Sequence, residues 1–227
     1  ATREAASMRP CMMGLETEYS VSGHRGDEAI GPGDVFRLLG GALRARIPCL
    51  PDSCACGMYT AQGSRFYLDH GGHPEWASPE LFSPADVTAY DKASERLLRA
   101  TRDRVQQDHP RVRITILKRN LCPVAPDSVT CGCHDAYTCW RPVDQLYDVA
   151  AQLTPHLATR TIYAGAGCLS AHPDSTGFEL SQRARHILHA TGAETTHQRA
   201  LFSSRLKATD ISPEGWMRIH LISKDSQ

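Results

Sequence analysis

Carboxylate side chains that could bind a metal are concentrated in two short segments of the chain. In the first, Glu16 and Glu18 stand two residues apart in an apolar stretch that predicts a strand, so both side chains point to the same face of a sheet. Charges on a central strand are costly unless they are paired or bind a metal. For this pair alone, a strand edge with both carboxylates in solvent is the alternative interpretation.

The second segment adds more carboxylates beside an arginine and a tyrosine. Arg65, Tyr67 and Asp69 share one face of a predicted strand, and Glu75 and Glu80 follow closely. Together the two segments carry more negative charge than one sheet face tolerates without a cation. Hard oxygen ligands suit Mg²⁺ or Mn²⁺, and Mg²⁺ commonly binds together with phosphates, which arginines could hold. The sequence has neither a Walker-type phosphate loop nor a Gly-x-Gly-x-x-Gly motif.

Cysteine clusters are a second candidate for metal binding. The chain has nine cysteines, and two pairs of them have Cys-x-Cys spacing: Cys54 with Cys56, and Cys131 with Cys133, which His134 follows. Structural zinc sites usually use Cys-x2-4-Cys spacing, so zinc is the less favoured interpretation. The first nine residues contain no apolar signal core, which disfavours secretion and disulfides. We therefore expect reduced thiols in loops or in the core.

The composition excludes several classes of protein. The 227 residues include 25 Lys and Arg and 25 Asp and Glu, so the formal net charge is zero, and 41% of the residues are hydrophobic. A balanced charge with ordinary apolar content disfavours disorder. Zero net charge gives no reason to expect nucleic acid or an anionic membrane as partner. No apolar run approaches the roughly 18–20 residues that cross a bilayer, and we expect a cytoplasmic protein.

Long helices alternate with strands without a regular βαβ rhythm, which predicts an α+β fold. One helix has Asp34 as its N-cap and a second begins at Ser83 and Pro84 and ends before Pro110. A third runs from Pro142 to Tyr163, is interrupted or kinked near Pro155, and ends at Gly165 to Gly167. Loops are expected over 48–57 and 120–132. The predicted strands are Met12 to Val21, Arg65 to His70, Arg111 to Arg119, His134 to Trp140 and Met217 to Ile222.

Eight segments, in order along the chain, resemble the Pup ligase and Pup deamidase/depupylase family, Pup being the prokaryotic ubiquitin-like protein. They are Gly14–Tyr19, Arg65–Asp69, His73–Glu80, Tyr90–Arg96, Gly132–Tyr137, Leu157–Gly167, Leu180–Arg183 and Glu194–Thr196. The resemblance implies a glutamine-synthetase-like fold, a mainly antiparallel sheet flanked by helices. It divides the chain into a tail, residues 1–11, and a partial catalytic domain, residues 12–227.

The resemblance also implies a chemistry. The ligase branch uses Mg-ATP to phosphorylate the C-terminal glutamate side chain of Pup, and a substrate lysine then attacks the acyl phosphate. The other branch hydrolyses that isopeptide bond or deamidates Pup. By resemblance, the magnesium ligands are Glu16, Tyr67 and Glu75, the nucleotide contacts are Arg65 and Ser78, and the catalytic carboxylate is Asp69. Further candidates for the same region are Glu18, Glu80, His134, Arg183 and Arg205.

The two branches are distinguished by spacing and by local motifs. Depupylases carry an extra loop of some tens of residues between the first carboxylate strand and the Arg-x-Tyr-x-Asp strand. Here only residues 19–64 lie between them, which is ligase-like. Tyr67–His70, Gly177–Ser181 and Leu153–Pro155 are instead similar to the depupylases. A hydrolase therefore stays open as the alternative function.

The chain also departs from the family pattern. Family members are roughly twice as long, Asp135 and Ala136 stand where the family has Glu and Asn, and after Thr196 an acidic pair and a histidine are missing. The chain could be a split-enzyme subunit, a fragment, or a non-catalytic binding module. A half sheet exposes a strand edge, so we expect a homo-oligomer or a heteromer with a second chain. The substrate is a Pup-like protein or a small carboxylate and amine.

Overall fold

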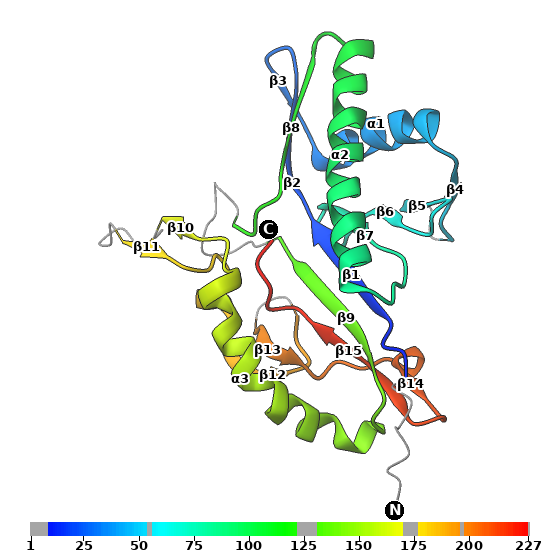
Figure 1. Cartoon of the computed structure of the whole chain (residues 1–227). Coiled ribbons are helices and arrows are strands. Elements are labelled where there is room, and N and C mark those ends of the chain that lie inside the picture. Colours follow the sequence, from blue (N-terminus) through cyan, green and yellow to red (C-terminus); the bar gives the residue numbers. More distant parts are fainter. Residues whose placement is uncertain (1–8, 54–55, 122–130, 170–176, 196–197, 227) are drawn as a thin grey trace, which may run out of the picture.

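One large sheet forms the middle of the molecule (Figure 1). The structure is a computed structural model, and it describes residues 9–53, 56–121, 131–169, 177–195 and 198–226. The strand order is β12-β13-β15-β9-β1-β7-β6-β5-β4, with β14 added to β15. Every pairing is antiparallel except β12 with β13. This confirms the predicted α+β class with a mainly antiparallel sheet. The strands are β1 (Met13–Glu18), β4 (Cys49–Pro51), β5 (Gly57–Thr60), β6 (Arg65–Leu68), β7 (Pro74–Ala77), β9 (Cys133–Cys139), β12 (His189–Gly192), β13 (Ala200–Ser203), β14 (Ile211–Ser212) and β15 (Trp216–Leu221).

The first predicted strand is in fact two strands in two sheets. After β1 the chain passes through Tyr19 into β2 (Ser20–Arg25), which pairs with β3 (Glu28–Ile30) and β8 (Val112–Leu117) in a three-stranded sheet. Tyr19 is buried, and its backbone N–H donates to the Pro74 carbonyl at 2.9 Å. A continuous apolar pattern does not show where a chain leaves one sheet for another, because both strands bury the same kinds of residue. A short hairpin, β10 (Cys168–Leu169) with β11 (Phe178–Glu179), lies apart from both sheets.

Three long helices occur where the sequence predicts them, with two corrections. Helix α1 (Pro32–Arg46) has Gly31 as N-cap rather than Asp34, because Pro32 takes the first helical position; α2 (Pro84–Asp108) starts after Ser83 as predicted. Helix α3 (Leu146–Ala164) follows a short 3-10 turn, Val143–Gln145, and contains Pro155 within one continuous helix that bends along its length (Figure 1), so the predicted interruption does not occur. Proline has no N–H to donate to the carbonyl of Ala151, one turn earlier in the helix. Ala151 and Pro155 are both exposed, so water can reach this carbonyl.

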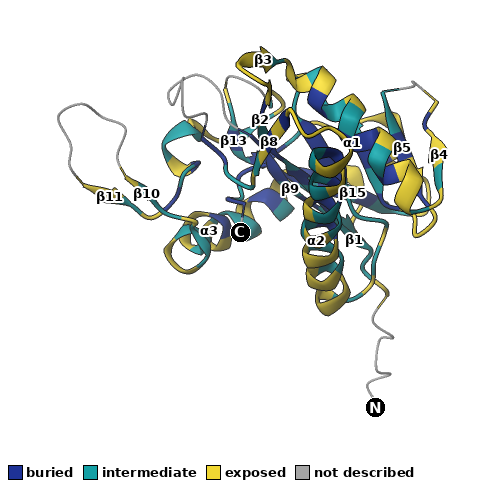
Figure 2. Ribbon diagram, turned by 90° about the horizontal axis from the view of Figure 1, so that it is seen from above, coloured by how far each residue is buried: buried dark blue, intermediate teal, exposed yellow. Residues whose placement is uncertain are grey.

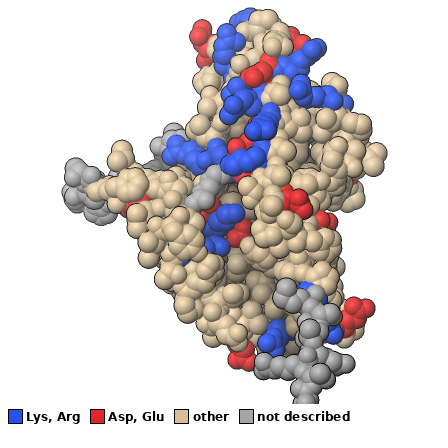
Figure 3. All heavy atoms as spheres, in the orientation of Figure 1, with Lys and Arg blue, Asp and Glu red and all other residues tan. Residues whose placement is uncertain are grey.

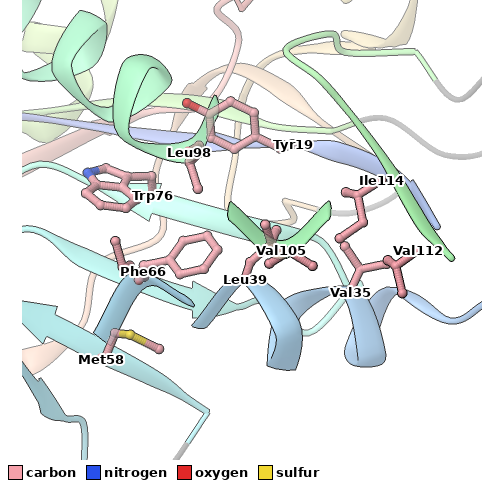
Figure 4. Packing of buried hydrophobic residues seen from close by; sticks show 11 residues of the cluster. Tyr19, Val35, Leu39, Met58, Phe66, Trp76, Leu98, Val105, Val112 and Ile114 are labelled. Carbon is pink, nitrogen blue, oxygen red and sulfur yellow. The ribbon is translucent and has the colours of Figure 1, made fainter. Parts of the chain in front are cut away.

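The helices bury one face of the large sheet. On the β6–β7 side, Phe66 and Trp76 pack with their ring centroids 5.5 Å apart beneath α1 and α2, against Leu39 and Leu98 (Figure 4). On the β15 side, α3 covers a second cluster that includes Phe202 of β13. The helices show buried residues toward the strands and exposed residues on their outer sides (Figure 2). Because strand residues alternate between faces, the intervening side chains point to the opposite face, which the three helices leave open.

The helix-covered side carries many basic residues over α2 and β8, interspersed with acidic ones (Figure 3). Lys118, just beyond β8, lies 2.7 Å from carboxylate oxygens of Asp91 and of Glu95. These basic residues are therefore partly neutralised by neighbours on α2. Among the described residues, no helix has the length and apolarity to cross a membrane.

Six cysteines are free thiols, as expected: Cys11, Cys49, Cys131, Cys133, Cys139 and Cys168. Cys56 departs from the expectation, because it is disulfide-bonded. Cys54 and Cys122 lie outside the described residues.

Candidate functional site

The carboxylates of the two sequence segments meet on the open face of the sheet. Strand β1 lies between β9 and β7, so it is a central strand and not an edge. In the register, Glu16 stands opposite His134 of β9, Glu18 opposite Glu75 of β7, and Glu75 opposite Tyr67 of β6. Directly opposed residues of antiparallel strands share a face, so these five side chains form one cluster.

Glu16 is surrounded by basic groups from β9 and β15. Its carboxylate lies 3.2 Å from His134 Nδ1 and 3.6 Å from His220 Nε2, and Arg218 Nη2 is 3.8 Å away. Burial alone would raise the pKa of Glu16, but the hydrogen bond with His134 and the nearby His220 ring outweigh it and hold the pKa well below its ordinary value. Glu16 is therefore ionised at neutral pH. The donor atoms of Glu16 and the two histidines lie within 4.8 Å of one another, close enough to share an ion.

Glu75 has the opposite electrostatics. Glu75 is 4% exposed, and its pKa is raised to about 8. Burial is the largest cause, followed by the charge of Glu16, and the charges of Glu18 and Asp69 act in the same direction. A hydrogen bond with Tyr67 counters this only in part. Glu75 therefore keeps a proton at neutral pH until a cation replaces it.

A divalent cation fits this cluster. Glu18, Glu75 and His134 offer three ligand atoms within 4.8 Å of one another, and the Tyr67 hydroxyl is hydrogen-bonded to Glu75. A buried carboxyl group whose pKa is raised by a neighbouring carboxylate, as the pKa of Glu75 is by Glu16, is a group that a magnesium or manganese ion would neutralise.

Asp69 lies in the turn that follows β6 and pairs with His73. Its carboxylate accepts hydrogen bonds from the His73 backbone N–H at 2.5 Å and from the His73 ring at 3.3 Å. Burial would raise the pKa of Asp69, but these bonds lower it. The same pairing, aided by a hydrogen bond to Cys131, raises the pKa of His73 to about 11. At neutral pH the two residues form an ion pair beside the cluster, and Glu18 lies 3.5 Å from the His73 ring.

Arg65 and Ser78 are engaged with the protein itself. The Arg65 guanidinium lies 4.1 Å from the centroid of the Tyr67 ring and donates to Asp52 at 2.6 Å. The Ser78 hydroxyl accepts from the Leu15 backbone N–H at 3.0 Å and so joins the end of β7 to β1. Both side chains are thereby fixed in position next to the cluster.

A cavity of about 250 Å³ opens beside Glu16 on this face. Ser78, Glu80, Arg218 and residues of β1 and β9 line it. Glu80 is exposed at its edge and lies outside the carboxylate cluster. The cavity provides space for part of a ligand next to Glu16.

The two remaining candidate arginines lie in different surroundings. Arg183 is 2% exposed and donates to the Cys131 carbonyl at 3.2 Å. Burial and the charge of Arg199 lower the pKa of Arg183, whereas the negative charge of Glu18 raises it. It lies close enough to the cluster to feel the charge of Glu18. Arg205 is exposed and donates to Thr195 at 3.5 Å, and within the described residues no hydrogen bond or ion pair joins it to the cluster.

Three residues of the site are absent from the sequence-based candidates: His73, Arg218 and His220. Arg218 and His220 alternate on the predicted last strand, which is a signal that both face one side. That β15 lies next to β9, and so brings them to Glu16, could not be read from the sequence. His73 lies in the His73–Glu80 segment that resembles the family, but only the geometry of the turn shows that it pairs with Asp69.

The Asp52–Arg65 ion pair provides a prediction about stability. Replacing Asp52 by Asn should lower the free energy of unfolding by about 1–2 kcal/mol, because Arg65 loses its charged partner and the buried side chain at position 52 loses a charge-assisted hydrogen bond. Urea unfolding at neutral pH measures the change. Asp34→Asn is the matched control: its ion pair with Arg37 is solvent-exposed, so its loss should cost less than about 0.5 kcal/mol. Equal effects for the two variants would contradict the assignment.

Comparisons with known proteins show which family the chain resembles. A family model described as Pup-ligase protein matches residues 11–227. The Pup–protein ligase of Bifidobacterium dentium is 32% identical over 219 residues, and that of Acidimicrobium ferrooxidans is 33% identical over 220 residues. The alignments cover 95% and 94% of this chain, but only 42% and 46% of those relatives.

The fold also matches a solved structure. The crystal structure of the complex between prokaryotic ubiquitin-like protein Pup and its ligase PafA superposes with a TM-score of 0.71 at 24% sequence identity. The match covers 96% of this chain and 42% of that chain. Nearly the whole of this chain therefore has the fold of that ligase, but it corresponds to less than half of the ligase's length.

Proposed function

Because the chain belongs to the Pup-ligase family, we propose that the open face of its sheet carries a magnesium- and ATP-dependent carboxylate–amine ligase site. One observation supports this above the others: Glu16, Glu18 and Glu75 lie together on adjacent central strands, where burial and the charge of Glu16 raise the pKa of Glu75. An ATP-dependent ligase needs such a site, since it must offset the charges of phosphates and of a developing acyl phosphate.

In this proposal Glu16, Tyr67 and Glu75 hold magnesium, with Glu18 and His134 adjacent. The metal would supply charge neutralisation and orientation of the phosphates. Arg65, fixed by Asp52 and by the Tyr67 ring, would contact the nucleotide.

Ser78 would contact the nucleotide from the wall of the 250 Å³ cavity, where Arg218 also lies. Arg218 carries positive charge next to Glu16 and is a further candidate for phosphate contact.

Asp69 is proposed as the base. A lysine amine is protonated at neutral pH and must lose a proton before it can attack an acyl phosphate. Asp69 is ionised and lies at the edge of the cluster, which suits it to hold the ammonium group and take up the proton. Its His73 partner keeps the carboxylate oriented.

We propose that the carboxylate substrate is the C-terminal glutamate of a Pup-like protein, since the relatives are Pup–protein ligases, and that the reaction takes place in the cytoplasm. The chain spans less than half of these relatives, so a second chain or segment would complete the enzyme. The alternatives are an amidohydrolase of the depupylase type and a non-catalytic module that binds Pup.

A trapping assay tests the proposed reaction. The purified chain is incubated with a Pup-like protein ending in glutamate, ATP, magnesium and hydroxylamine as the amine. The proposal predicts a hydroxamate at the C-terminal glutamate together with one ADP per bond formed. Release of ammonia from a glutamine-ended Pup without ATP consumption would favour the hydrolase. Pup binding without either product would favour the binding module.

A further inference from the structure

The Cys131–Cys133 pair is divided between the two faces of the sheet. Cys133 belongs to β9 and points to the helix-covered side, where its Sγ lies 3.9 Å from the Thr17 hydroxyl. Cys131 precedes the strand and is hydrogen-bonded to the His73 side chain on the open side. The two thiols therefore cannot share one ion, and the Cys-x-Cys spacing does not define the site.

Cys131 has other metal-ligating neighbours. Single donor atoms of Glu18, His73 and Cys131 all lie within 4.8 Å of one another. The three residues come from the end of β1, from the loop before β7 and from the segment before β9, so no sequence motif links them. A carboxylate oxygen, an imidazole nitrogen and a thiol sulfur form a mixed donor set, unlike the all-oxygen sites that magnesium prefers.

The surroundings hold these donors in place. Asp69 lies 3.3 Å from His73 Nδ1, the kind of carboxylate partner that commonly orients a metal-bound histidine. The Gly132 backbone N–H donates to Glu18. A Cβ atom at Gly132 would come within 2.7 Å of the second Glu18 oxygen, and one at Gly71 within 2.9 Å of His73 Nδ1. Side chains larger than glycine at these two positions would displace the Glu18 and His73 side chains.

Accessibility favours an ion over a larger ligand. Cys131 is 2% exposed, whereas the His73 and Glu18 side chains are 19% and 12% exposed. An ion can reach the thiol from the His73 side. A buried thiol of this kind is poorly placed to attack a bulky substrate.

We propose that Glu18, His73 and Cys131 bind a borderline divalent transition ion of the zinc type, at a site that borders the magnesium cluster through Glu18 and differs from it in the His73 and Cys131 ligands. Three protein ligands leave a fourth tetrahedral position for water. Binding displaces the proton of the Cys131 thiol and a proton of the His73 imidazolium into solvent, because only the thiolate and the neutral imidazole are ligands. The site does not depend on the proposed ligase activity, since its test needs neither ATP nor Pup.

Cobalt titration tests the site, because a thiolate bound to Co²⁺ gives a near-ultraviolet charge-transfer absorption that oxygen and nitrogen ligands do not. The unmodified chain, with its disulfide intact, is titrated with CoCl2 after removal of bound metal. We expect one equivalent to produce this absorption and an excess of Zn²⁺ to abolish it. Cys131→Ser should lose the absorption, and His73→Gln should weaken cobalt binding at least about tenfold.

Two controls separate this site from its neighbours. Cys133→Ala changes the thiol on the opposite face and should leave the cobalt absorption unchanged. Glu16→Gln alters the proposed magnesium site and should also leave it unchanged. Near-ultraviolet circular dichroism checks that each variant is folded. Retention of the absorption in Cys131→Ser, its loss in Cys133→Ala, or its absence from the unmodified chain at saturating cobalt would overturn the proposal.

Discussion

Replacing Asp69 by Asn is expected to slow ATP-dependent bond formation by about 10²–10⁴-fold, the range that a positioned acid or base contributes. Asparagine has the same shape and can still accept the hydrogen bond from the His73 backbone N–H. It cannot accept a proton from an amine or balance the charge of an ammonium group. The loss should therefore appear in the rate of the chemical step.

The readouts are chosen to distinguish loss of a base from loss of structure. Hydroxamate formation and ADP release give the rate, and calorimetric titration gives the affinity for Mg-ATP, which should change by no more than about twofold. Glu28→Gln is the control, since Glu28 is exposed on β3, which belongs to the three-stranded sheet and not to the large one. Full turnover by Asp69→Asn would exclude Asp69 as the base. A parallel loss of Mg-ATP affinity would mean that Asp69 acts on the metal site instead.

Glu75→Gln is expected to stabilise the metal-free protein at high pH while it abolishes magnesium binding. Glu75 has an ordinary pKa of 4.5 when unfolded and about 8 when folded. Between these values the folded state binds more protons than the unfolded state, so stability falls as pH rises through this window. The amide never ionises, so the variant lacks this loss.

The stabilisation should be small at pH 5 and on the order of 2–4 kcal/mol at pH 9, where the folded wild type must hold an ionised carboxylate among Glu16, Glu18 and Asp69. Urea unfolding in the presence of a chelator measures it. Glu28→Gln should show no such pH dependence. A Glu75→Gln variant that is less stable than wild type at pH 9 would contradict the electrostatic description of the cluster.

The sequence contained enough information to predict the long helices and the main strands. Ser83 and Pro84 mark the start of α2 because proline suits the first helical position, and Val112 and Ile114 mark β8 through alternation, since both signals act within a few residues. The break at Tyr19 and the continuity of α3 through Pro155 could not be predicted locally. The first depends on which sheet each half of the segment joins, and the second on exposure of the freed carbonyl.

The candidate site was predictable in its carboxylates but not in its basic partners. Alternation alone placed Glu16 and Glu18 on one face, because the side-chain period of a strand is fixed. The approach of His220 to Glu16 depends on β15 pairing with β9, across a long stretch of chain. The pairing of His73 with Cys131 likewise depends on how loops meet, which neither spacing nor composition encodes.

Calorimetric titration of the purified chain with ATP, with and without Mg²⁺, tests most directly whether this chain holds a magnesium–nucleotide site on its open sheet face. The wild type should bind ATP only when magnesium is present, and Glu16→Gln should lose that binding while Glu28→Gln keeps it. Binding that is independent of magnesium, or that Glu16→Gln retains in full, would contradict the assignment of the carboxylate cluster.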